Sequence, residues 1–151
     1  MSAREAVVAI RAALKARGWN QRKVSVRVRP CTYSSAISAT IYDASIPIAE
    51  VKAIVDQHRH VRRCEITGDI LEGGNTYTDV EYELGVLDPL TAEITARIEK
   101  GEQEIRGYTV VFDCVYERWT AYGNSDDLQT FVAYSHAEMA RSLAIRTAGH
   151  P

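Results

Sequence analysis

Two short segments near the start of the chain alternate apolar and polar residues so regularly that each is typical of a β-strand. They span Lys23–Arg29 and Ala36–Tyr42. Their apolar positions are Val24, Val26 and Val28 in the first, and Ile37, Ala39 and Ile41 in the second. Because successive side chains of a strand point to opposite faces, each segment can bury only one face. The short link of residues 31–35 favours a hairpin-type connection, so the fold must contain a half-buried sheet.

Helical patterns in the chain supply the layer that would cover that sheet. Residues 3–17 carry apolar residues on one helical face, and Ser2 with Glu5 fits a capping box at its start. A second helix is expected to open at Ser45-Ile46-Pro47, and a third at Asp88-Pro89. Ser125 is expected to cap the last helix, with Asp126 and Asp127 in its first turn and an apolar face made of Leu128, Phe131, Val132, Met139 and Leu143.

Three further strands complete the prediction. Residues 61–67 and 76–84 are expected to be strands joined through a turn at Gly73-Gly74-Asn75. Residues 108–119 are β-branched and aromatic with little polar interruption, which indicates a central strand buried on both faces. The order α-β-β-α-β-β-α-β-α predicts an α+β fold, with a mainly antiparallel sheet and helices packed on one face. We expect one domain over residues 1–151, in which 85–151 form a C-terminal helix-strand-helix extension.

Composition indicates an ordinary globular protein of 151 residues, 46% of them hydrophobic and 25% charged. No apolar run is long enough to span a bilayer, and the first residues lack the apolar core of a secretory signal, so no membrane association is expected. The cysteines are three, widely spaced and odd in number, which is not a disulfide framework. A reducing compartment, the cytoplasm, is therefore expected.

Charge is unevenly distributed along the chain, although its formal net value is only −2. Residues 1–63 carry 12 Lys+Arg and 4 Asp+Glu, whereas residues 64–151 carry 6 Lys+Arg and 16 Asp+Glu. Such asymmetry marks an anion-binding face, an acidic interaction surface, or two halves that pair with each other. The acidic region from Glu65 to Glu104 is also able to mimic nucleic-acid phosphates.

Two sets of residues are candidates for binding. A nucleic-acid or anion site is predicted on the polar side of the first strand, at Arg22, Lys23, Arg27 and Arg29. A partner-binding surface is predicted around the glycine turn and the strand after it, at Glu72, Asn75, Tyr77, Asp79, Glu81 and Glu83. If the two strands adjoin in one sheet, their opposite charges pair across the solvated face instead.

Other chemistry is weakly supported by the sequence. His58, His60 and Cys64 are zinc-ligand types, but no fourth ligand stands at a matching spacing. Cys31, Cys64 and Cys114 are expected to behave as small apolar residues, because no pattern places a base beside them. We therefore expect no catalytic residue, no metal and no cofactor.

Residues 23–84 also carry a succession of short motifs. A valine-rich strand precedes Tyr33-Ser34-Ser35, a strand of small residues and a proline-initiated helix with Glu50-Val51 follow, and Gly68-Asp69-Ile70-Leu71 leads into Gly73-Gly74-Asn75-Thr76-Tyr77. In these motifs the segment resembles domain 29 of the large polyvalent protein-associated group. The resemblance implies a bacterial mobile element, such as a phage, plasmid or conjugative element, and carries over no catalytic residue.

Together these observations predict a non-enzymatic binding protein of a mobile element that acts through a protein partner. Inhibition of a host defence system would fit such a protein. The alternative is a nucleic-acid-binding accessory module that uses the basic N-terminal face.

Overall fold

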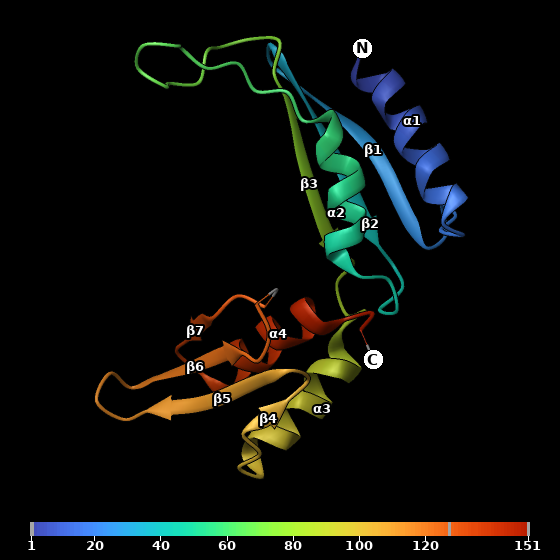
Figure 1. Cartoon of the computed structure of the whole chain (residues 1–151). Coiled ribbons are helices and arrows are strands. Elements are labelled where there is room, and N and C mark those ends of the chain that lie inside the picture. The colour runs from blue at the N-terminus through green and yellow to red at the C-terminus, as the bar shows by residue number, and fades with distance from the viewer. Residues whose placement is uncertain (1, 127, 151) are drawn as a thin grey trace. The chain divides into compact units, whose positions relative to one another are not determined.

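The computed structural model describes residues 2–126 and 128–150, and within that part the side chain of Pro30 is not described. It is an α+β fold with helices and two mostly antiparallel sheets, as the sequence predicts (Figure 1). The chain divides into two compact units, Met1–Glu83 and Leu84–Pro151. We call them the N-terminal and C-terminal units.

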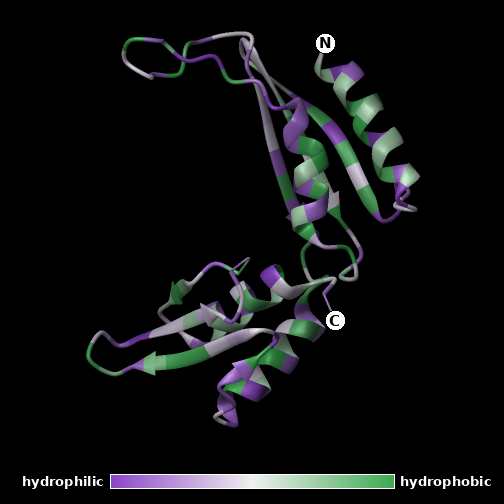
Figure 2. Ribbon diagram, viewed as in Figure 1, coloured by the Kyte–Doolittle hydropathy of each residue, from purple (hydrophilic) through white to green (hydrophobic). Residues whose placement is uncertain are grey.

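The N-terminal unit is a three-stranded sheet with its helices on one face. Its elements are α1 (Ala3–Ala16), β1 (Val24–Cys31), β2 (Ser34–Ile41), α2 (Ile48–Val55), the 3-10 turn η1 (Asp56–His58) and β3 (Thr76–Tyr82), in the sheet order β1-β2-β3. The predicted alternation is confirmed, since Val24, Val26, Ile37, Ala39 and Ile41 are all buried beneath the helices. Figure 2 shows the hydrophobic stripes of α1 and α2 that this packing uses.

Local signals set the ends of α1 as expected. The Ser2 side chain accepts from the Glu5 backbone N–H, and the Glu5 carboxylate accepts from the Ser2 N–H at 2.7 Å, which completes the capping box. Gly18 has φ +81 just past the last turn, a conformation that glycine adopts without strain.

The expected strand at residues 61–67 is wrong. This segment belongs to a long connection between η1 and β3, in which single bridges join His60 to Thr76 and Arg63 to Ile70. With no strand there to reverse the chain, β3 returns beside β2 in the parallel direction, and α2 lies in the crossover. The sheet is therefore antiparallel between β1 and β2 and parallel between β2 and β3.

The C-terminal unit is a second α+β arrangement. Its elements are α3 (Asp88–Glu99), β4 (Glu104–Ile105), β5 (Tyr108–Asp113), β6 (Arg118–Gly123), β7 (Phe131–Ala133) and α4 (His136–Thr147). The four strands form an antiparallel meander in the order β4-β5-β6-β7. Its core joins the two helices to the sheet through Ile94, Ile98, Ile105, Tyr108, Val110, Met139 and Leu143.

Two expectations for this unit are corrected. Residues 108–119 are a hairpin rather than one buried strand, because the Asp113 carboxylate accepts from the N–H groups of Val115 and Tyr116 and turns the chain. The last helix begins at His136 and is capped by Ser135, whose side chain accepts from Glu138 N–H. Ser125 and Asp126 precede β7 in the chain, and Asp127 lies outside the described residues.

Candidate interaction surface

One face of the β1-β2-β3 sheet carries no helix, and we call it the outer face. Side chains at alternate positions of the three strands meet there in rows fixed by the strand register. The rows are Ser25–Thr40–Glu81, Arg27–Ser38–Asp79 and Arg29–Ala36–Tyr77. The outer face therefore has a basic margin on β1, Arg27 and Arg29, a middle of small residues on β2, and an acidic margin on β3, Asp79 and Glu81.

The two charged margins do not pair directly. Each row crosses two strand spacings, or about 9.5 Å, between its β1 and β3 members. Within residues 2–126 and 128–150 the ion pairs are Arg17–Glu50, Lys23–Asp43 and Arg97–Glu102, none of which joins β1 to β3. The shared face is as the alternation predicts, but the direct pairing of Arg27 or Arg29 with Glu81 requires adjacent strands and does not occur.

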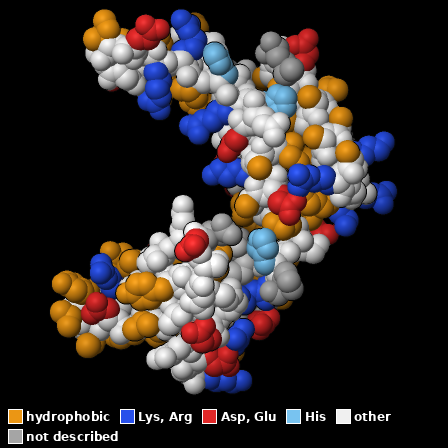
Figure 3. Space-filling view, in the orientation of Figure 1, with side chains coloured by type: hydrophobic (Ala, Val, Ile, Leu, Met, Phe, Trp, Pro, Cys, Tyr) orange, Lys and Arg blue, Asp and Glu red, His pale blue; other side chains and the backbone are white. Residues whose placement is uncertain are grey.

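The charge asymmetry along the chain is much smaller when the charges are counted within the N-terminal unit instead of up to residue 63. Residues 1–83 carry 12 Lys+Arg and 10 Asp+Glu, because the acidic strand β3 belongs to the same unit as the basic strand β1. On the face that Figure 3 shows, the Lys and Arg side chains of this unit lie at several separate places rather than in one patch. The N-terminal unit is thus nearly neutral overall and bipolar on its outer face.

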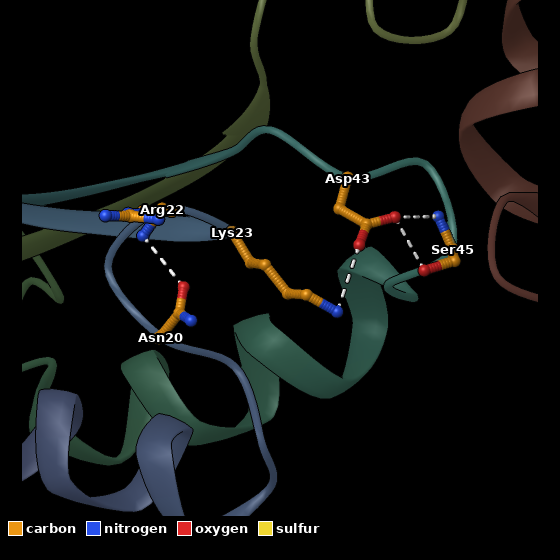
Figure 4. A network of polar contacts seen from close by, with 5 residues as sticks. All are labelled: Asn20, Arg22, Lys23, Asp43 and Ser45. Atoms are coloured by element: carbon orange, nitrogen blue, oxygen red, sulfur yellow. Dashed lines mark hydrogen bonds and ion pairs between the residues drawn. The ribbon is translucent and has the colours of Figure 1, made fainter.

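Lys23 and the Arg22 backbone take part in local contacts at the start of β1 (Figure 4). Lys23 Nζ lies 3.3 Å from Asp43 Oδ2, and the Arg22 N–H donates to Asn20 Oδ1 at 3.0 Å. Asp43 Oδ1 accepts from the Ser45 Oγ–H at 2.6 Å and from the Ser45 N–H at 2.9 Å. These Ser45 bonds, and then Lys23, lower the pKa of Asp43. Lys23 therefore helps to join β1 to the chain after β2, and the exposed side chains of Arg27 and Arg29 form the basic margin.

Asn75 is not available to a partner, contrary to its place among the predicted partner-binding residues. It is 3% exposed. Its Oδ1 accepts from the Arg62 N–H at 2.9 Å, and its Nδ2 donates to the Leu71 carbonyl at 2.8 Å and to Tyr77 Oη at 3.3 Å. Asn75 thus holds the connection of residues 59–75 in shape, and its role is structural. Glu72, on the same connection, is exposed, as is Glu83 just beyond β3.

We expect Asn75→Ala to loosen this connection. The substitution leaves the Arg62 N–H and the Leu71 carbonyl without their partner, at a cost of about 1.5 kcal/mol. Amide hydrogen exchange at Arg62 should accelerate by about tenfold, whereas Glu72→Ala, at an exposed neighbouring position, should leave it within twofold. Unchanged exchange at Arg62 in Asn75→Ala would show that the side chain does not hold the connection.

The C-terminal unit presents an apolar surface that the sequence analysis missed. Val111, Tyr122 and Val132 lie on the sheet face away from the helices, and Val115 and Tyr116 are exposed at the β5–β6 turn. Figure 3 shows hydrophobic side chains gathered at the end of this hairpin. The sequence shows the apolar run of residues 108–119. Because we interpreted this run as a strand buried on both faces, we did not predict that part of it is exposed.

Cysteine and histidine side chains do not assemble a reactive or metal-binding centre in the described part of the chain. Cys31 is exposed, Cys64 is partly exposed, and Cys114, which lies in the apolar run expected to be a buried strand, is exposed. Hydrogen bonds from Thr67, through its side chain and then its backbone, and from the Ile66 backbone lower the pKa of Cys64. No three His, Cys, Asp or Glu residues among those described gather as metal ligands, so His58, His60 and Cys64 form no such group.

Comparison with known proteins gives no family assignment. No family model matches the chain, and neither the curated proteins nor the solved structures yield a match. The resemblance of residues 23–84 to domain 29 of the large polyvalent protein-associated group therefore stays a prediction. No helix within the described residues is both long and apolar enough to cross a membrane.

Proposed function

We propose that this chain is a non-enzymatic binding protein that acts through a protein partner, and that the outer face of the β1-β2-β3 sheet makes the contact. The observation that carries the proposal is the bipolar outer face itself. Its basic and acidic margins lie on one surface, are exposed, and do not neutralise each other through ion pairs in the described residues. A surface of this kind is complementary to a protein that offers both signs of charge.

The acidic margin disfavours nucleic acid as the partner. Asp79 lies about 9.5 Å from Arg27 across the sheet, which is close to the screening length of about 8 Å at physiological salt. A phosphate at the basic margin would therefore feel repulsion from the acidic margin as well as attraction to the arginines. Proteins that track phosphates concentrate Lys and Arg on one face instead.

The biological setting that we propose rests on the sequence resemblance. We propose that the protein belongs to a bacterial mobile element and acts in the cytoplasm, and that its binding inhibits a host defence system. The three cysteines are free thiols, which supports a reducing compartment.

The proposal can be tested by affinity capture from a bacterial host, with variants of the outer face compared by mass spectrometry. We expect a specific protein to be captured by the native chain and lost with Arg27→Glu/Arg29→Glu and with Asp79→Lys/Glu81→Lys. Arg4→Glu/Lys15→Glu is the matched control for Arg27→Glu/Arg29→Glu, because it makes the same charge change at exposed positions of α1. Capture that is insensitive to both outer-face variants would contradict the proposal.

A second measurement addresses the alternative function. A fluorescent oligonucleotide, single-stranded or duplex, should not bind at low salt. Salt-dependent binding that Arg27→Glu/Arg29→Glu removes, and that the α1 control retains, would favour the nucleic-acid-binding module over a protein partner.

A further inference from the structure

The strand β3 is an edge of its sheet and leaves part of its backbone unpaired. The Ser35 N–H donates to the Asn75 carbonyl, and the Glu83 N–H donates to the Ile41 carbonyl. In this parallel register the odd-numbered residues of β3 direct their backbone groups towards β2. The backbone groups of Thr76, Thr78, Val80 and Tyr82 therefore point away from β2, towards the open edge of the sheet. Figure 1 shows β3 as an outer strand of this sheet.

The chain already uses the first of these positions. His60 and Thr76 exchange two backbone hydrogen bonds, of 2.9 and 2.7 Å, in an antiparallel bridge. The segment before His60 is the turn η1 and does not continue along β3. In the part of the chain that the structure describes, the backbone groups of Thr78, Val80 and Tyr82 have no hydrogen-bond partner. An antiparallel ladder thus begins at this edge and stops after one pair.

The opposite edge of the sheet, on β1, is occupied in part. Arg11 donates from its guanidinium to the Val26 carbonyl of β1 at 2.6 Å, and the Val24 N–H donates to the Asn20 carbonyl at 2.9 Å. Pro30, further along β1, has no N–H to offer. Proteins commonly hinder strand addition at sheet edges by such means, so these two bonds and Pro30 make the edge of β1 less available to an added strand than the edge of β3 beyond Thr76.

The acidic side chains of β3 determine which residues an added strand would need at its edge. Asp79 and Glu81 are exposed on the outer face, and residues of an added strand directly opposite would lie about 5 Å away. A second copy of β3 would place acidic residues opposite acidic residues, which is destabilising. A strand with Lys or Arg at these positions would instead form cross-strand pairs. Its intervening side chains would lie on the helix side with Val80 and Tyr82, which favours apolar residues there.

We propose that the protein partner supplies an extended segment with alternating basic and apolar residues, and that this segment adds antiparallel to β3. The inference rests on the proposed function and specifies how the partner is bound. Its apolar residues face Thr78, Val80 and Tyr82 and exchange backbone hydrogen bonds with them, and its basic residues face Asp79 and Glu81. Main-chain bonds give the affinity and alternate side chains the specificity, as in other cases of strand addition.

A synthetic peptide of alternating Lys and Val, about seven residues long, tests this geometry on the full chain. We expect binding to shift the amide signals of Thr78, Val80 and Tyr82 in NMR spectra and to slow their exchange. Peptides that carry N-methyl groups on the Val residues should bind at least tenfold more weakly, because those N–H groups face β3. The matched peptide with N-methyl groups on the Lys residues should bind within about threefold of the parent. Equal effects of the two modifications would overturn the proposal.

Charge swaps provide the second arm. Asp79→Lys/Glu81→Lys should weaken the Lys/Val peptide at least tenfold and strengthen a Glu/Val peptide, whereas Arg27→Glu/Arg29→Glu should change neither affinity by more than about threefold. If Asp79→Lys/Glu81→Lys leaves the affinity for the Lys/Val peptide unchanged, the inference is overturned. If the peptide does not bind but cellular capture still depends on the outer face, strand addition is wrong and the proposed function stands. If capture is insensitive to the outer face, the proposed function fails by itself.

Discussion

Gly123→Ala should destabilise the C-terminal unit by about 3 kcal/mol, near the upper end of the cost of overpacking. A Cβ at this position would lie 2.2 Å from the Leu128 carbonyl oxygen, 2.4 Å from Leu128 Cβ and 2.7 Å from the Leu128 carbonyl carbon. Two of these atoms belong to the backbone, so no rotation of a side chain removes the overlap. Gly123 ends β6, and its lack of a side chain lets the chain before β7 pass against it.

The stability of this unit can be followed separately, because the chain has two tryptophans, Trp19 in the N-terminal unit and Trp119 in the C-terminal unit. Urea unfolding followed by 19F NMR of 5-fluorotryptophan should show the loss at Trp119. Gly101→Ala is the control: Gly101 also has no Cβ, and its φ of +79 makes alanine strained, but nothing lies within 4 Å of the added atom. We expect it to cost about 1 kcal/mol. Equal losses in both variants would show that the approach of Leu128 is not limiting.

Tyr82 should make the N-terminal unit sensitive to alkaline pH. Burial raises the pKa of Tyr82 to about 12, although the hydrogen bond from the Ile48 N–H opposes the shift. Because the folded pKa lies above the unfolded value of about 10, the stabilisation is complete below pH 10 and is lost as the pH rises towards 12. Because the Tyr82 side chain is only half-buried, solvent screening reduces this effect, and the loss should reach about 1 kcal/mol at pH 12.

Tyr82→Phe separates this effect from general alkaline unfolding. Tyr82 Oη donates to the Ile46 carbonyl at 2.6 Å and accepts from the Ile48 N–H at 3.1 Å, at the start of α2. The variant should therefore be less stable by about 1 kcal/mol at pH 8 and should lack the Tyr82 part of the loss above pH 10. Urea unfolding at several pH values, monitored at Trp19, measures both. A loss above pH 10 that is as steep in Tyr82→Phe as in the native chain would exclude Tyr82 as its source.

Sequence patterns among neighbouring residues were sufficient to predict several parts of the fold. The alternation of β1 and β2 predicts which side chains are buried, because a strand has only two faces. Ser2, Glu5 and Gly18 define the two ends of α1 through contacts within one or two turns of the helix. The placement of Arg27 and Glu81 on one sheet face also follows from alternation. In each case the deciding interaction connects residues close in sequence, or depends only on which side is apolar.

The sequence did not determine which strands are neighbours. That β2 lies between the basic and acidic margins follows from the parallel return of β3, and this depends on pairing between residues about 40 positions apart. Residues 61–67 have suitable strand composition but no neighbouring strand, so they form a connection held by Asn75. The bipolar outer face and the open edge of β3 are therefore products of tertiary pairing.

Strand pairing in the tertiary structure also explains why two predictions for the C-terminal unit were wrong. The apolar run of residues 108–119 is compatible with one long strand or with a hairpin, and the Asp113 turn, with β7 pairing beside β6, gives the hairpin. Phe131 and Val132 have a spacing that suits the last helix, but their backbone groups complete the sheet instead. Composition and periodicity thus determined the apolar faces of this protein, whereas strand partners were decided only in the tertiary structure, because backbone hydrogen bonds are the same for every residue except proline.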